Sequence, residues 1–173
     1  MKPPLDPVLA SRLAAAQTLI QTGRLDEAVR LLQSAAQSRP QSGELHRMLA
    51  FVALRRGDLA GADLSVRDAL GLNRRDPASH VLAGQIHLAA GQEREAEAAF
   101  HKALALDRRS DPAATALCEL LVVLNRADEA LKVTAPLVLS VGASATLLAA
   151  HAAAQNTAGQ VEASLETSLK VLA

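Results

Sequence analysis

The sequence predicts an all-α fold, a right-handed superhelix (α-solenoid) built from about five helix-turn-helix units. The main observation is a period of 34 residues, marked by a column of four glycines and one asparagine: Gly23, Gly57, Gly91, Asn125 and Gly159. Two columns of small residues keep the same phase: Ala28, Ala62, Ala96, Ala130 and Ser164, and Ala16, Ala50, Gly84, Cys118 and Ala152. Self-similarity at this period is typical of helical repeat arrays, whose units are too small to bury their apolar faces alone and therefore stack.

The composition also favours helices. Half of the 173 residues are hydrophobic, but only two of them, Phe51 and Phe100, are aromatic. Alanine and leucine therefore supply most of the apolar content, and both are strong helix formers. Strands usually draw on β-branched and aromatic residues.

Each predicted unit consists of two helices joined by a tight turn at the glycine column. Glycine ends a helix there because it tolerates the left-handed backbone that closes the last turn. We expect first helices at about 8–22, 43–56, 77–90, 111–124 and 145–158. Second helices are expected at about 25–38, 59–72, 93–106, 127–140 and 161–172.

The expected domain organisation is a short leader followed by one repeat array. Residues 1–7 contain three prolines and are expected to be a flexible leader. Residues 8–173 form the array, with repeats at about 9–42, 43–76, 77–110, 111–144 and 145–173.

The C-terminal repeats depart from this pattern. Pro136 falls inside a predicted helix, where proline removes one backbone hydrogen bond. Ser164 and Ser168 occupy columns that are small or apolar elsewhere, and no later helix covers the leucines of the last helix: Leu165, Leu169 and Leu172. Because a solenoid needs a solvated end, we expect either that the natural protein continues or that this helix self-associates.

The turn columns resemble the tetratricopeptide repeat (TPR) family. The matching runs are 23–28, 57–62, 91–96 and 125–130, and Pro40 matches the proline between units. The resemblance covers essentially residues 8–173 and implies a superhelix whose concave groove is lined by first helices. It also implies binding of a protein or peptide rather than catalysis.

Carried onto this chain, the resemblance places a set of candidate partner-binding residues in the groove: Gln17, Arg47, Phe51, Arg55, Gln85 and Glu119. Buried aromatic residues and arginines are frequent hot spots in interfaces. A mainly apolar groove with amide and arginine groups suits an extended segment or an amphipathic helix. The family's groove for chaperone C-terminal carboxylates uses Lys, Asn and Arg, and the comparable row here has neither Asn nor Arg: Ala14, Met48, Leu82, Ala116 and Ala150.

Composition argues against several other functions. Eighteen basic and eighteen acidic residues cancel, and Trp and Tyr are absent, so nucleic acid is not an expected partner. The apolar stretches are too short to span a bilayer. The single cysteine, Cys118, gives no sign of an oxidising compartment, so a cytoplasmic location is expected.

No catalytic, metal or cofactor site is expected. The five histidines lack the convergent ligands that a zinc site requires. The sequence has no Gly-rich phosphate loop followed by Lys, no G-x-S-x-G and no metalloprotease helix motif. Cys118 and His87 lie on adjacent first helices and could form a nucleophile pair. The stronger interpretation is that Cys118 packs as a small hydrophobe in its column.

Two functions remain open at the level of the sequence. The first is a non-catalytic TPR scaffold that mediates protein–protein or protein–peptide interaction through its groove. The alternative is the N-terminal, substrate-positioning TPR region of a larger bacterial enzyme of the glycosyltransferase, sulfotransferase or hydroxylase type.

Overall fold

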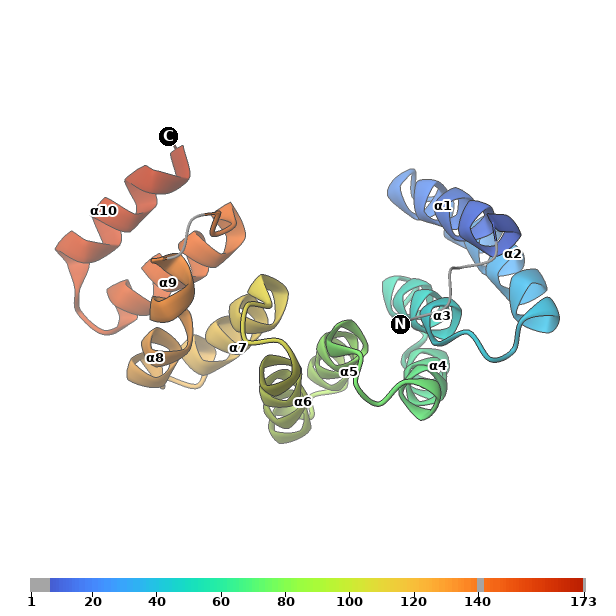
Figure 1. Ribbon diagram of the computed structural model, residues 1–173. Helices are drawn as coiled ribbons and strands as arrows, with labels where there is room; N and C mark the ends of the chain where they lie inside the picture. Colours follow the sequence, from blue (N-terminus) through green and yellow to red (C-terminus); the bar gives the residue numbers. More distant parts are fainter. Residues whose placement is uncertain (1–6, 140–141, 173) are drawn as a thin grey trace. The chain divides into compact units, whose positions relative to one another are not determined.

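The computed structural model describes residues 7–139 and 142–172. Within this part of the chain there are ten α-helices and no strands, so the predicted all-α class is confirmed (Figure 1). The helices are α1 (Pro7–Gln21), α2 (Leu25–Ser38), α3 (Gly43–Arg55), α4 (Leu59–Leu72), α5 (Pro77–Ala89), α6 (Glu93–Leu106), α7 (Asp111–Val123), α8 (Ala127–Val138), α9 (Ala145–Thr157) and α10 (Val161–Leu172). The predicted leader lies outside the described residues, except Pro7, which begins α1.

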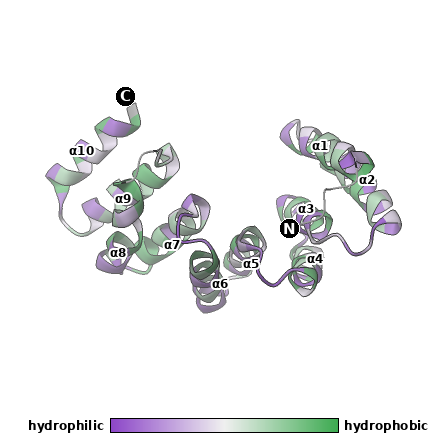
Figure 2. Cartoon of the chain, in the orientation of Figure 1, coloured by the Kyte–Doolittle hydropathy of each residue, from purple (hydrophilic) through white to green (hydrophobic). Residues whose placement is uncertain are grey.

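The helices form two compact units, α1–α5 and α6–α10, which divide between Ala90 and Gly91. In the first unit each helix packs on the next one along the chain, and α3 also contacts α5. In the second unit successive helices pack in the same way, and α7 also contacts α9. Each helix carries both apolar and polar residues, as expected for helices that are buried on one face (Figure 2).

The turn column works as the sequence predicts. Gly23, Gly57, Gly91 and Gly159 have φ angles of 75°, 77°, 72° and 77°, and Asn125 has a φ of 58°. Asparagine is one of the few other residues that enters this left-handed region without great cost. In the first turn the N–H of Gly23 donates to the carbonyl of Ile20 at 3.2 Å, and that of Arg24 donates to the carbonyl of Leu19 at 2.8 Å. These bonds satisfy carbonyls that the end of α1 would otherwise leave unpaired.

A capping column precedes the later first helices and repeats with the same period of 34 residues: Ser42, Asp76, Ser110 and Ser144. Three of these side chains accept a hydrogen bond from the backbone N–H three residues later. Ser110 makes no such bond. A cap of this kind stabilises a helix start by about 1 kcal/mol.

The small columns lie where helices cross closely. Ala28, Ala62, Ala96 and Ala130 are all 0 % exposed. Ala16, Ala50 and Cys118 of the second column are equally buried. This confirms the steric reason for the columns, because a larger side chain would hold the helices apart.

The departures from the repeat pattern in the fourth and fifth repeats have local explanations. Pro136 lies in α8, which ends two residues later at Val138. Ser164 Oγ donates to the carbonyl of Ala152 on α9 at 2.9 Å, and Ser168 Oγ donates to the carbonyl of Ser164 at 2.8 Å. Both hydroxyls are therefore satisfied.

The apolar face of α10 is open in the structure. The side chains of Leu165 and Leu169 are 62 % and 66 % exposed. The side chain of Leu172, the third leucine in this expectation, lies outside the described residues. Within the described ranges, none of the helices has the length and apolar character needed to cross a bilayer.

Candidate functional site

The first unit contains a hollow of about 540 Å³, bordered by α1, α3 and α5, which we call the α3 hollow. Its lining residues are Gln17, Ile20, Gln21, Glu44, Arg47, Met48, Phe51, Arg55, Ala78, Val81, Leu82 and Gln85. Apolar side chains from all three helices form part of this lining, and amide and charged side chains supply the rest.

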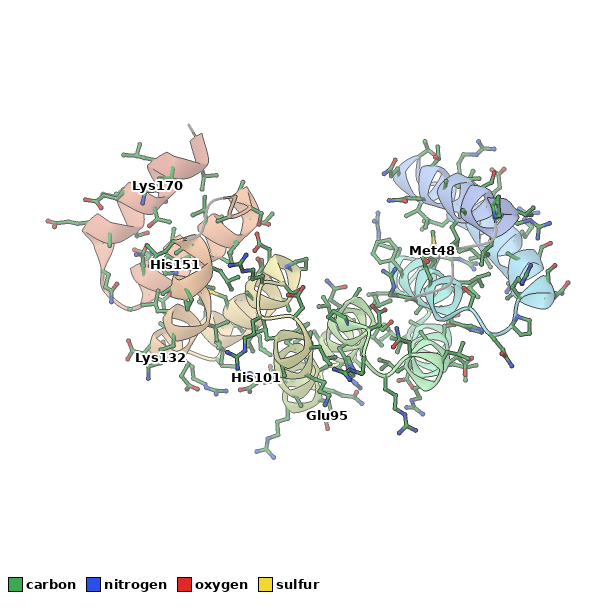
Figure 3. All side chains as sticks on the ribbon, viewed as in Figure 1. Met48, Glu95, His101, Lys132, His151 and Lys170 are labelled. Atoms are coloured by element: carbon green, nitrogen blue, oxygen red, sulfur yellow. The ribbon has the colours of Figure 1, made fainter. Side chains whose placement is uncertain are left out.

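Helix α3 supplies the central stripe of the α3 hollow. Arg47, Phe51 and Arg55 follow one another at intervals of four residues, which places them on one face of the helix. Met48, marked in Figure 3, adds a second apolar side chain from the same helix. The helix itself therefore sets the order of the groups along the hollow.

Phe51 is shared between the hollow and the core. Its ring packs against the buried cluster of α1, α2 and α3, but the side chain remains only half-buried. The guanidinium carbon of Arg55 lies 5.9 Å from the centre of the ring. This distance is within the range of a cation–π interaction, which favours an Arg55 side chain held over the aromatic face.

Arg47 contacts the residue that caps the neighbouring first helix, α5. Its Nε atom lies 3.4 Å from Oδ2 of Asp76, and the carboxylate of Asp76 also accepts the capping bonds of α5 from Ser79. The same Nε atom has no hydrogen bond of acceptable geometry among the described residues. We therefore interpret the pair as an electrostatic contact rather than a well-directed hydrogen bond.

The structure brings together five of the six candidate residues. Gln17, Arg47, Phe51, Arg55 and Gln85 all line the α3 hollow. Glu119, the sixth, is an exposed residue of α7 in the second unit. A part in partner binding stays a prediction for all six residues.

Two of the lining residues that the sequence did not single out share one column of the repeat. Glu44 and Ala78 lie 34 residues apart, in one column of the first helices, three residues before Arg47 and Val81 respectively. Helical spacing of three residues places them on the same face as those neighbours, so the period could have identified them.

A buried polar cluster lies in the second unit. Thr134 Oγ1 is 2.9 Å from the carbonyl of Ala130, to which it donates, and 2.7 Å from Nδ1 of His151. Cys118 Sγ donates to the carbonyl of Ala150 at 3.3 Å. Figure 3 marks His151 on α9 and Lys170 on α10. Burial, together with the charge of Lys170, lowers the pKa of His151.

The same surroundings keep the thiol of Cys118 protonated. Burial is the main cause that raises its pKa to about 11, with a smaller contribution from the charge of Glu119, and the hydroxyl of Thr134 acts against both. A thiol with this pKa is not an activated nucleophile at neutral pH. Cys118 therefore serves as a small packing residue, as its column predicts.

Two other histidines bind backbone carbonyls. His46 Nε2 lies 2.9 Å from the carbonyl of Pro40, and His80 Nε2 lies 3.0 Å from that of Arg74. Across residues 7–139 and 142–172, no group of three or more His, Cys, Asp or Glu side chains could hold a metal ion.

The helix pairs, the turn column and the period together define a helical-repeat protein. The family profile of the tetratricopeptide repeat matches residues 19–86 and 87–154. These matches cover most of the chain, which therefore belongs to the tetratricopeptide repeat family. The fold is consistent with a protein-interaction scaffold.

Several solved structures share this fold at low sequence identity. The chain is similar to TTC0263, a thermophilic TPR protein of Thermus thermophilus, with 19% identity, a TM-score of 0.79 and coverage of 95% of this chain and 90% of that one. For MamA the values are 15%, 0.71, 95% and 90%. For YrrB, described as a TPR protein with an unusual peptide-binding site, they are 16%, 0.65, 93% and 83%. A search of curated protein sequences found no match.

Proposed function

We propose that this protein is a non-catalytic scaffold that binds a segment of a partner protein in the α3 hollow. One observation carries the proposal: a half-buried aromatic ring, Phe51, lies between two arginines on the central helix of a hollow. Aromatic and arginine side chains in partly desolvated positions supply much of the binding energy in protein interfaces.

The size and lining of the hollow support this function. Pockets for small ligands typically measure about 300–1,000 Å³, and the α3 hollow, at about 540 Å³, falls within this range. Its apolar side chains would exclude water from an inserted side chain, whereas Gln17, Gln21 and Gln85 offer amide groups that can bond to a peptide backbone. An extended segment or an amphipathic helix has the required combination of groups.

Comparison with a solved relative adds support of a general kind. YrrB is described as having a peptide-binding site, so at least one protein of this fold binds a peptide. Our proposal extends that activity to this chain, with a cytoplasmic location that fits a single free thiol. Glu119 on the second unit is proposed as a further contact to the partner.

Selection of peptides tests the proposal. A random peptide-display library is selected on the intact chain, and the affinity of the recovered peptides is then measured for Phe51→Ala and for Leu64→Ala. Leu64 is a matched control because it is an exposed apolar residue of α4 that does not line the hollow. We expect Phe51→Ala to weaken binding by about 2 kcal/mol or more, and Leu64→Ala to leave the affinity unchanged.

A second variant blocks the hollow without touching its core. Ala78 is exposed and lines the hollow, so Ala78→Trp fills space without replacing a buried side chain. Binding should be lost in this variant, while its circular-dichroism spectrum stays that of the unaltered chain. Failure to recover any peptide, or full affinity in Ala78→Trp, would contradict the proposed function.

A further inference from the structure

The α3 hollow has an acidic residue at one end of α3 and a basic residue at the other. Glu44 lies in the first turn of this helix and Arg55 in its last turn, eleven residues later. At about 1.5 Å of rise per residue, their backbones are separated by about 16 Å. Both side chains line the hollow, with Met48 and Phe51 between them.

These two charges are the ones that the protein itself leaves open to a partner. Arg47, the third charged residue of the lining, already faces the carboxylate of Asp76 at 3.4 Å. In the described part of the chain, neither Glu44 nor Arg55 forms an ion pair, and Arg55 has only the ring of Phe51 beneath it. The hollow therefore carries one open negative charge and one open positive charge at opposite ends of an apolar floor.

Nearby arginines of the same unit show the contrast. Arg24 binds Glu27 at 2.6 Å, and Arg56, the residue next to Arg55, binds Asp26 at 3.0 Å. Both side chains also interact favourably with the dipole of α3, because the acidic Glu44 lies near its N-terminal end and the basic Arg55 near its C-terminal end. The interaction with the dipole requires no hydrogen bond from either side chain, so both can still form hydrogen bonds with a ligand.

We propose that the α3 hollow takes a dipolar segment of a partner protein: an apolar stretch with a basic side chain beside Glu44 and an acidic side chain beside Arg55. This inference rests on the proposed function and adds the chemistry and the orientation of the partner. In an extended segment about five residues span 16 Å, and side chains alternate between its two faces, so a basic and an acidic residue that both face the hollow lie four or six positions apart. Charge complementarity of this kind fixes the register and direction of a bound segment.

Synthetic peptides of equal length provide the probes. Each contains the apolar stretch of a peptide selected on the intact chain and is labelled with fluorescein. The peptides differ only at two positions, which are four or six residues apart. These two positions hold one Lys and one Glu in both orders, two Glu, two Lys, or two Gln. Affinity is measured by fluorescence anisotropy at low and high salt.

The Lys/Glu peptide, in its better order, should bind about two- to fivefold more tightly than the Gln peptide for each matched charge, as is usual for exposed ion pairs. High salt should remove the advantage. In Glu44→Lys the preference should move to the peptide with two Glu, and in Arg55→Glu to the peptide with two Lys. Arg94→Glu on α6, an exposed residue of the second unit, is the matched control and should leave the preference unchanged.

The outcomes separate this inference from the function on which it rests. Equal affinity for all peptides, or a preference that survives both charge reversals, overturns the dipolar segment. If the peptides bind without a charge preference and their binding is still lost in Ala78→Trp, the hollow remains the binding site and the proposed function stands. If Ala78→Trp binds as well as the unaltered chain, both the inference and the proposed function are wrong.

Discussion

Thr134 Oγ1 lies 2.7 Å from Nδ1 of His151, and both side chains are buried. The residue pairs at the same positions in the three preceding repeats are apolar: Leu32 with Leu49, Val66 with Ala83, and Phe100 with Leu117. A hydrogen-bonded pair thus replaces an apolar contact in the C-terminal half. Since Thr134 also donates to the carbonyl of Ala130, its hydroxyl accepts from an Nδ1–H of the neutral ring.

This relationship predicts a pH-dependent stability. Because burial lowers the pKa of His151 in the folded chain, the unfolded chain takes up the proton first as the pH falls. The free energy of unfolding should therefore decrease once the pH drops below about 6.5, the ordinary pKa of histidine. Urea unfolding between pH 7.5 and 5 measures the slope, in a window above the range where the carboxylates of Glu97 and Glu129, whose pKa values are lowered by Arg126, take up protons.

His151→Leu is the variant that isolates this effect. It restores the leucine of the corresponding positions Leu49 and Leu117 and leaves Thr134 bonded to Ala130. Its stability should change less between pH 7.5 and 5 than that of the unaltered chain. An identical slope in the two proteins would mean that other groups control the acid response.

Ala62→Leu should destabilise the first unit by about 1–3 kcal/mol, because Ala62 is fully buried where α4 crosses its neighbours. Ala60→Leu is a matched control: it is the same substitution on the same helix, at an exposed position. Thermal or urea unfolding of both variants tests the prediction. Equal stability of the two would show that the column of small residues does not mark a close helix crossing.

The two aromatic residues should respond differently to truncation. Phe100 is 0 % exposed, so Phe100→Ala should cost about 3–5 kcal/mol of stability. Phe51 is only half-buried, and Phe51→Ala should cost clearly less while the chain stays folded. Urea unfolding of both variants measures the difference. A loss in Phe51→Ala as large as that in Phe100→Ala would make Phe51 a core residue and remove the basis of the binding site.

The C-terminal helices should open first. Helix α10 packs mainly against α9, and the side chains of Leu165 and Leu169 are left exposed. In a stack held together by contacts between neighbours, an uncovered end frays before the centre. Hydrogen exchange on the isolated chain should show residues 127–173 exchanging well before residues 25–106.

Concentration provides the control for this measurement. If chains associate through α10, the difference in exchange between the two regions should shrink as the protein concentration rises. Uniform protection at a concentration where the protein is monomeric would contradict the prediction.

The sequence by itself determined the helix pairs and their turns. The left-handed turns at Gly23 and Asn125, and the burial of Ala62 and Cys118, follow from a period that is visible in one dimension. The reason is physical: turn geometry and helix crossings depend on residues a few positions apart. The same residue types recur at these positions in successive 34-residue repeats, so the pattern is visible in the sequence. Five of the six candidate residues also reached one hollow, because residues of one column share a face of successive helices.

Only the tertiary structure decided which side chains meet across helices. The pair of Thr134 and His151, the contact of Arg47 with Asp76 and the hydrogen bond from Ser164 to Ala152 each join residues that are more than ten positions apart in the chain. Rotamers and the exact approach of neighbouring helices select such partners, and the repeat pattern contains neither. For the same reason the sequence could name Arg55 as a groove residue, whereas the structure was needed to place its guanidinium over Phe51 and leave its charge open to a partner.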